Sequence, residues 1–150
     1  MSRQPFEDVD PVRRRIMASI RGRDTKPELL VRSTLHRLGY RYTLHPRHLP
    51  GRPDIVFPRR KVAIWVHGCF WHQHHGCPLA HVPRTREGYW GPKLARNVER
   101  DKEKADALRA LGWHPHVVWE CELQKQDWLL RLKRLLGPPS RLHATALTCW

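Results

Sequence analysis

The feature that most constrains this chain is a dense run of histidines and cysteines in residues 67–77, His-Gly-Cys-Phe-Trp-His-Gln-His-His-Gly-Cys. Thiolate and imidazole groups together suit a tetrahedral zinc ion, and a structural zinc site takes all four ligands from the protein. The candidate ligands are Cys69, Cys77, Cys121 and either His74 or His75. The alternative is two buried thiols beside a solvated histidine run, but the density of ligating groups favours a zinc-bound loop.

The same segment leaves histidines that a zinc site does not need. His67 and His72 are free for acid–base chemistry, because imidazole is the side chain that titrates near neutral pH. The ordinary alternative for each is a core or surface position. Cys149 lies in the last residues of the chain, far from the other cysteines in sequence, and is interpreted as taking no part in metal binding.

The charge of the chain indicates a polyanionic partner. Lys and Arg number 28 against 14 Asp and Glu, so the formal net charge is 28 − 14 = +14. Nucleic acid is favoured over an anionic membrane surface, since no basic amphipathic anchor of adequate length is visible. No apolar run approaches the ~20 residues of a membrane span, and the first ten residues lack a secretory apolar region. We therefore expect a cytoplasmic protein.

The patterning predicts one α/β domain with a mixed central sheet flanked by helices. Thr25 and Glu28 form a capping-box signature that begins a helix ending before Gly39. Strands are predicted at 40–44, 54–57, 62–66 and 115–119, the middle two as a hairpin, and further helices at 93–111 and 126–136. Inward positions of the 93–111 helix are expected at Leu94, Val98, Ala105, Leu108 and Leu111. The predicted divisions are a basic arm at 1–23, a domain at 24–137 with an irregular loop at 67–92, and a loosely attached tail at 138–150.

Three acidic residues are candidates for binding a cation beside a phosphate. Asp54 opens an apolar strand, so its carboxylate lies at a sheet end where it could hold a divalent ion. Each has an ordinary alternative: Asp54 a turn, Glu28 the capping box, and Asp101 a solvated helix surface. A basic protein that brings carboxylates to phosphate needs a cation between them, which metal-assisted phosphodiester cleavage would explain.

Five stretches of the chain form a specific series: Arg-Asp-Thr at 23–25, Leu-Pro-Gly-Arg-Pro-Asp at 49–54, His-Gly-Cys-Phe-Trp-His at 67–72, Lys93 with Asn-Val-Glu-Arg-Asp at 97–101, and Leu-Gly-Trp at 111–113 with Val-Trp-Glu-Cys at 118–121. In this order, between about residues 16 and 121, they strongly resemble the very short patch repair (Vsr) mismatch endonucleases. The string at 67–72 is highly distinctive by itself.

The resemblance implies a restriction-endonuclease-like core, a structural Zn²⁺ and a catalytic Mg²⁺. It implies nicking of double-stranded DNA on the 5′ side of the T of a T·G mismatch, the lesion left when 5-methylcytosine deaminates. It also implies a monomer that cooperates with mismatch-repair proteins and is associated with the nucleoid.

Residue roles follow from the resemblance by position. Asp54 and the backbone carbonyl of Val66 would hold Mg²⁺, and His72 would be the general base. Supporting active-site residues would be Glu28, His67 and Asp101, and the zinc ligands would be Cys69, His74, Cys77 and Cys121. DNA contacts would come from an aromatic wedge of Phe70, Trp71 and Trp90, from Met17 and Ile20 in the minor groove, and from Lys93 and Asn97 at the mismatched bases.

Two positions depart from the family pattern. Val66 stands where the family often has Thr, and little loss is expected because the contact is through the backbone. Gly76 is an extra residue before Cys77, so the loop must bulge. The competing readings are a non-catalytic zinc module that binds nucleic acid, a hydrolytic zinc enzyme, and a related nuclease with a different DNA target.

Overall fold

The computed structural model of the chain describes residues 23–139. The predicted arm at 1–23 with Met17 and Ile20, the predicted tail at 138–150 and Cys149 lie wholly or mostly outside these residues. In the described part, helix α2 (Lys26–Arg37) precedes strands β1 (Thr43–Leu44), β2 (Ile55–Phe57) and β3 (Val62–His67). Helix α3 (Glu87–Ala110), strand β4 (His114–Trp119) and helix α4 (Asp127–Leu136) follow. Short 3-10 turns are η1 (Pro58–Arg60), η2 (Pro78–Ala80) and η3 (Glu120–Gln124).

The four strands form one mixed sheet in the order β1-β2-β3-β4. The first two pairings are antiparallel and β3 pairs with β4 in parallel. The predicted hairpin is confirmed, with η1 and Lys61 in the left-handed conformation closing it. Strand β1 is shorter than predicted because Tyr40 leaves the sheet to enter the core, where its hydroxyl donates to the carbonyl of Gly137.

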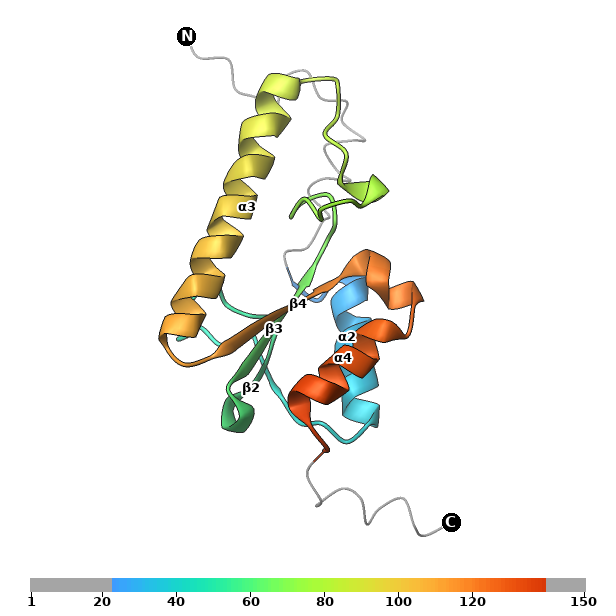
Figure 1. Cartoon of the computed structure of the whole chain (residues 1–150), viewed down its shortest axis with the longest axis vertical. Helices are drawn as coiled ribbons and strands as arrows, with labels where there is room; N and C mark the ends of the chain where they lie inside the picture. Colours follow the sequence, from blue (N-terminus) through green and yellow to red (C-terminus); the bar gives the residue numbers. More distant parts are fainter. Residues whose placement is uncertain (1–22, 140–150) are drawn as a thin grey trace.

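Helices cover both faces of the sheet, as Figure 1 shows with α3 on one side and α2 and α4 on the other. Alternate residues of β3 point to opposite faces, as a strand requires. Val62 and Ile64 pack toward α2 and α4, whereas Ala63 and Trp65 pack toward Leu108 of α3. The α/β architecture with a mixed sheet between helices is therefore confirmed. The restriction-endonuclease-like core stays a prediction.

The start of α2 follows its sequence signal with one change. Thr25 is the N-cap, and its side chain accepts a hydrogen bond from the Glu28 amide. The Glu28 carboxylate reaches one residue further back than a capping box requires, to the amide of Asp24 at 2.9 Å. This reach leaves the other carboxylate oxygen of Glu28 turned toward the interior.

Helix α3 corrects two predictions. It begins at Glu87 rather than Lys93 and carries Pro92 inside it, so the irregular loop ends near residue 86 and not 92. Val98 and Leu111, predicted to face inward, are exposed, while Leu94 and Leu108 are buried as predicted.

The polar residues Asn97 and Asp101 lie on the inward side of α3, where they contact the loop after β3. This accounts for Val98 turning to solvent: the middle of α3 faces a polar site instead of the core. Within residues 23–139, no helix combines the length and apolar character that a membrane crossing requires.

Candidate active site and metal centre

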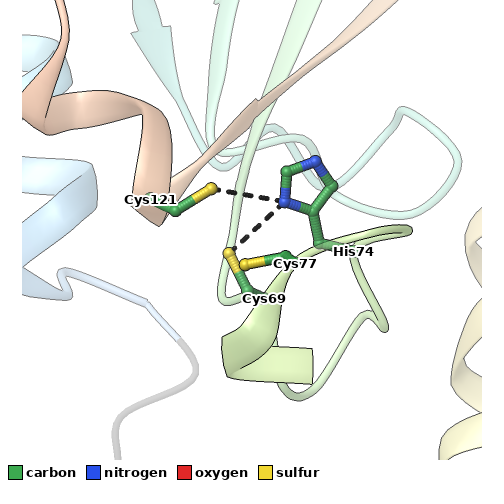
Figure 2. Close-up of side chains that lie close together, drawn as sticks. All are labelled: Cys69, His74, Cys77 and Cys121. Carbon is green, nitrogen blue, oxygen red and sulfur yellow. Dashed lines mark hydrogen bonds between the residues drawn. The ribbon is translucent and has the colours of Figure 1, made fainter. Parts of the chain in front are cut away.

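Three cysteines and one histidine meet where the loop after β3 passes the end of β4 (Figure 2). Cys69, His74 and Cys77 come from the loop, and Cys121 comes from η3. We call these four residues the cysteine–histidine cluster. The His74 Nδ1 atom lies 3.6 Å from the Cys69 sulfur and 3.3 Å from the Cys121 sulfur. All four ligand atoms lie within 4.8 Å of one another.

These separations fit a tetrahedral metal ion. Zinc bonds to sulfur and nitrogen of ordinary length imply a sulfur–nitrogen separation of about 3.6 Å. Burial, the largest cause, raises the pKa of the Cys69 thiol to about 12, so a cation beside it is what would favour the thiolate. The choice of histidine left open by spacing falls on His74, because His75 is exposed and outside the cluster. The cluster could therefore hold a metal ion.

The loop that carries the cluster is fixed by backbone hydrogen bonds as well. The amide of Cys69 donates to Glu120 Oε1 at 3.0 Å, which joins the loop to the end of β4. Within the loop, the His74 amide donates to the Cys69 carbonyl and the Cys77 amide to the His74 carbonyl. Gly76 has a positive φ and open space around it, so the extra residue is accommodated as a bulge.

A second polar group, which we call the acid–histidine group, lies beside this cluster. It consists of Glu28, Asp54, His67, His72 and Asp101, contributed by α2, the residue before β2, β3, the loop and α3. Asp54 Oδ2 accepts a hydrogen bond from the Val66 amide at 2.8 Å. Burial, as the largest cause, raises the pKa of Asp54 to about 6, and the Glu28 charge adds to the rise.

His72 is held in one orientation. Its Nδ1 lies 2.6 Å from Asp101 Oδ2, and its ring stacks on that of His67 with centroids 3.7 Å apart and planes 6° from parallel. A carboxylate can only accept, so we assign the proton to Nδ1, which leaves the lone pair of the neutral ring on Nε2. Burial lowers the pKa of His67 to about 3, so His67 is uncharged at neutral pH.

A histidine that the sequence pattern did not single out completes this region. The His45 ring lies between two of the carboxylates, with Nε2 2.8 Å from Glu28 Oε1 and Nδ1 3.7 Å from Asp54 Oδ1. His45 Nε2 is buried and, in spite of the short contact, forms no hydrogen bond with any described residue. A buried imidazole between two carboxylates, whose short contact to Glu28 is poorly aligned, fits a site that takes up a water or a substrate oxygen.

Arg32 completes the charge balance on the α2 side. Its guanidinium lies 2.8 Å from Asp24 Oδ1 and 3.3 Å from Glu28 Oε1. Glu28, 2% exposed, is therefore a buried carboxylate with a cationic partner rather than a simple helix cap. His45 reaches the site only through the fold, so no short-range signal could identify it, whereas Arg32 lies four residues after Glu28 on α2, a spacing at which an ion pair could have been expected.

The predicted wedge residues form one aromatic cluster at the start of α3. The ring centroids of Phe70, Trp71 and Trp90 lie 5.1 to 5.8 Å apart. The Lys93 ammonium lies over the rings of Trp71 and Trp90, 5.7 Å from each centroid, and donates to the Tyr89 hydroxyl. Asn97 donates to the Trp71 carbonyl at 3.1 Å, so its amide fixes the loop to α3. Among the described residues, the side chains predicted to contact DNA thus lie together, whereas Met17 and Ile20 fall outside the described residues.

The comparison with known proteins agrees with this arrangement. The family model described as DNA mismatch endonuclease Vsr matches residues 8–78. The chain is 49% identical over 132 residues to the type II nicking enzyme V.XorIIP of Xanthomonas oryzae, covering 87% of this chain and 96% of that protein. It is 42% identical over 113 residues to the DNA mismatch endonuclease Vsr of Escherichia coli, covering 75% and 72%.

A third relative is the type II nicking enzyme V.NmeAIP of Neisseria meningitidis, 39% identical over 122 residues, or 81% of this chain and 86% of that one. The chain therefore belongs to the Vsr family of DNA mismatch endonucleases, which makes it a DNA-cleaving hydrolase.

Proposed function

We propose that the chain nicks one strand of double-stranded DNA on the 5′ side of the T in a T·G mismatch, such as deamination of 5-methylcytosine leaves. The observation that carries the proposal is the orientation of His72, whose Nδ1 lies 2.6 Å from Asp101 Oδ2 while its ring stacks on His67, the residue next to Val66. Asp54 is tied to the same strand by its hydrogen bond from the Val66 amide. A proton acceptor and a metal-binding carboxylate beside one phosphate are the requirements for hydrolysis.

In this proposal Asp54 and the carbonyl of Val66 hold Mg²⁺. The bound ion would supply Lewis-acid polarisation of the scissile phosphate and charge compensation for the leaving 3′ oxygen. The donor set fits this hard cation, because Mg²⁺ binds through one or two carboxylates and keeps several waters. The raised pKa of Asp54 supports the assignment, since a buried carboxylate without a cation pays a desolvation cost.

His72 accepts the proton of the attacking water at Nε2. Asp101 stabilises the imidazolium that forms, and His67 remains neutral at the stacked distance of 3.7 Å. Glu28 contributes hydrogen-bond acceptors for bound water, and His45, whose ring lies between Glu28 and Asp54, contributes a donor. General-base catalysis of this kind is worth roughly 10²- to 10⁴-fold in rate.

Mismatch selection is assigned to the aromatic cluster of Phe70, Trp71 and Trp90. Inserting rings between base steps costs a few kcal/mol, and the cost is least at a mispair. Lys93 and Asn97 lie beside these rings and are proposed to contact the mismatched bases. Zn²⁺ in the cysteine–histidine cluster would be structural, because four protein ligands leave no open position.

The proposal is tested with purified protein and three duplexes that differ only in carrying T·G, C·G or T·A at one position, with and without Mg²⁺. We expect a single nick in the T·G duplex and only with Mg²⁺. A protein that binds the T·G duplex tightly but never cuts it would instead support the non-catalytic nucleic-acid-binding module. Cleavage of all three duplexes at equal rates would exclude mismatch specificity.

A further inference from the structure

One tryptophan touches both the cysteine–histidine cluster and the acid–histidine group. Trp119 is the last residue of β4 and lies opposite His67 in the parallel register of β3 and β4. Its ring stacks on His74 with centroids 4.2 Å apart and planes 8° from parallel. The same ring meets His67 edge to face at 5.3 Å. A single indole therefore contacts a candidate metal ligand on one side and an active-site histidine on the other.

The contacts continue beyond His67 without a gap. His67 stacks on His72, and His72 is bound to Asp101 on α3. The series His74, Trp119, His67, His72 and Asp101 thus runs from the cysteine–histidine cluster to helix α3. One hydrogen bond fixes the direction of the His72 ring but leaves rotation about that bond open, and the face contact with His67 removes this freedom.

Trp119 is not explained as ordinary core. Among the described residues, neither of the two hydrophobic cores of the domain includes it. Its backbone is also fixed from both sides: its amide donates to Glu122 at 3.2 Å, and the next residue, Glu120, accepts from the Cys69 amide. The end of β4 is therefore built to hold this ring against the loop.

We propose that Trp119 is a positioning residue for strand cleavage, fixing the ring planes of His67 and His72 relative to the cysteine–histidine cluster. This inference rests on the proposed function of His72 as general base. Stacked and edge-to-face ring pairs stabilise a defined geometry beyond simple burial. A general base displaced by about 1 Å can cost on the order of 100-fold in rate, so loss of these ring contacts is expected to be measurable.

The test compares Trp119→Leu, which removes both ring contacts, with Trp119→Phe, which keeps an aromatic face and edge. Trp113→Leu is the matched control, because Trp113 lies near the opposite end of β4 and packs against the α3-side core and Lys61. For Trp119→Leu we expect a fall in kcat of about 10- to 100-fold with unchanged KM for the mismatched duplex. Trp119→Phe is expected to recover most of the rate, and Trp113→Leu to leave kcat at the wild-type value.

A spectroscopic readout separates positioning from general damage and from failure of the proposed function. In zinc-loaded wild-type protein, exchange of Zn²⁺ for the larger Cd²⁺ displaces His74. We expect the imidazole NMR signals of His67 and His72 to shift with it. The shift should vanish in Trp119→Leu and persist in Trp119→Phe and Trp113→Leu.

The proposal would be overturned if the His67 and His72 imidazole signals of the wild-type protein did not change on metal exchange. This comparison uses the wild-type protein alone, so it does not depend on whether a Trp119 variant folds. A folded, zinc-loaded Trp119→Leu protein with wild-type kcat would overturn it as well. If the wild-type protein cuts no duplex, the proposed function fails, while the imidazole signals still decide whether Trp119 joins the two groups.

Discussion

The cysteine–histidine cluster and the acid–histidine group are neighbours on either side of Trp119, yet they are assembled in opposite ways. The first takes three of its four side chains from the nine residues between Cys69 and Cys77. The second gathers side chains from α2, the start of β2, β3, the loop and α3. Four protein ligands fill the coordination sphere of a tetrahedral ion, which suits a structural role. The acid–histidine group does not provide such a full set of ligands, so an ion bound there could also bind water and phosphate.

The difference in electrostatics follows the difference in assembly. In the cysteine–histidine cluster every ligand atom faces the others, so one ion would satisfy the whole set. In the acid–histidine group, Asp54 keeps a raised pKa and His45 keeps a buried Nε2 without a hydrogen bond. The folded chain bears the cost of these buried groups, as proteins commonly do where they bind substrate.

The largest effect is expected from His72→Ala. Loss of the proton acceptor should lower the single-turnover nicking rate by about 10²- to 10⁴-fold. Binding of the T·G duplex should change little, because the aromatic cluster and the basic surface remain. His75→Ala is the matched control, since this exposed neighbour belongs to neither group. Nicking by His72→Ala near the wild-type rate would remove the general-base role from the acid–histidine group.

Cys121→Ser should act on stability and metal content rather than on chemistry directly. It removes the one ligand that ties the loop to η3, so bound zinc should fall from one per chain to none. The free energy of unfolding should fall by on the order of several kcal/mol. Zinc content, thermal unfolding and proteolysis within residues 68–86 measure this, with Cys149→Ser as the control. Zinc retained at one per chain would exclude Cys121 as a ligand.

Trp71→Ala tests whether the aromatic cluster discriminates or merely binds. Removing one wedge ring should reduce the preference for T·G over C·G duplexes by about 1–3 kcal/mol, with a smaller loss of affinity for matched DNA. Competition binding with the two duplexes gives both numbers. An equal loss for both duplexes would refute the wedge. Leu79→Ala, an exposed apolar residue of the same loop, is the control.

Asp54→Asn should stabilise the folded chain at the same time as it abolishes nicking. The pKa of Asp54 rises from 3.8 to about 6 on folding, so its contribution to stability is fully present below pH 3.8 and is lost as the pH rises through 6. The neutral amide avoids this loss. In Mg²⁺-free buffer we expect Asp54→Asn to be about 3 kcal/mol more stable than wild type at pH 8, and about equal to it near pH 4.

The control for this comparison is Asp106→Asn on the exposed face of α3, which should show no pH-dependent gain. The contribution of His67 to stability has the opposite pH dependence: because its pKa is lowered to about 3, this contribution rises with pH between 3 and 6.5. Since His67 is present in every variant, its contribution cancels in the difference. A constant difference between Asp54→Asn and wild type at all pH values would contradict burial as the cause of the raised pKa.

Sequence patterns predicted the parts of the fold that local rules control. The Thr25 cap, the hairpin around η1, strand β4 and the last helix, predicted at 126–136, are all confirmed. The early start of α3 escaped prediction because Gly88, Gly91 and Pro92 are poor helix formers. Packing of Trp90 against the loop rings of Phe70 and Trp71, with Tyr89 against Trp90, outweighs that local preference.

The two sites differ in the same way. Spacing indicated the cysteine–histidine cluster, apart from the choice between His74 and His75, because three of its four ligands are close in sequence and Cys121 directly follows a predicted strand. The acid–histidine group needed the family resemblance, since Glu28, Asp54 and Asp101 each have an ordinary local explanation. His45 and Trp119 were missed because only the completed sheet brings them to the site, and Arg32 was missed although it lies four residues after Glu28 on the same helix.

The most direct test of whether the acid–histidine group or the cysteine–histidine cluster is catalytic is to measure which metal ion nicking requires. Zinc-loaded protein, freed of other divalent ions and carrying one zinc per chain, is mixed with the T·G duplex before and after Mg²⁺ is added. The account predicts no nick until Mg²⁺ is present, and a rate in Asp54→Asn that stays at background with Mg²⁺. Full nicking by the zinc-loaded protein without Mg²⁺ would move the chemistry to the cysteine–histidine cluster and contradict the account.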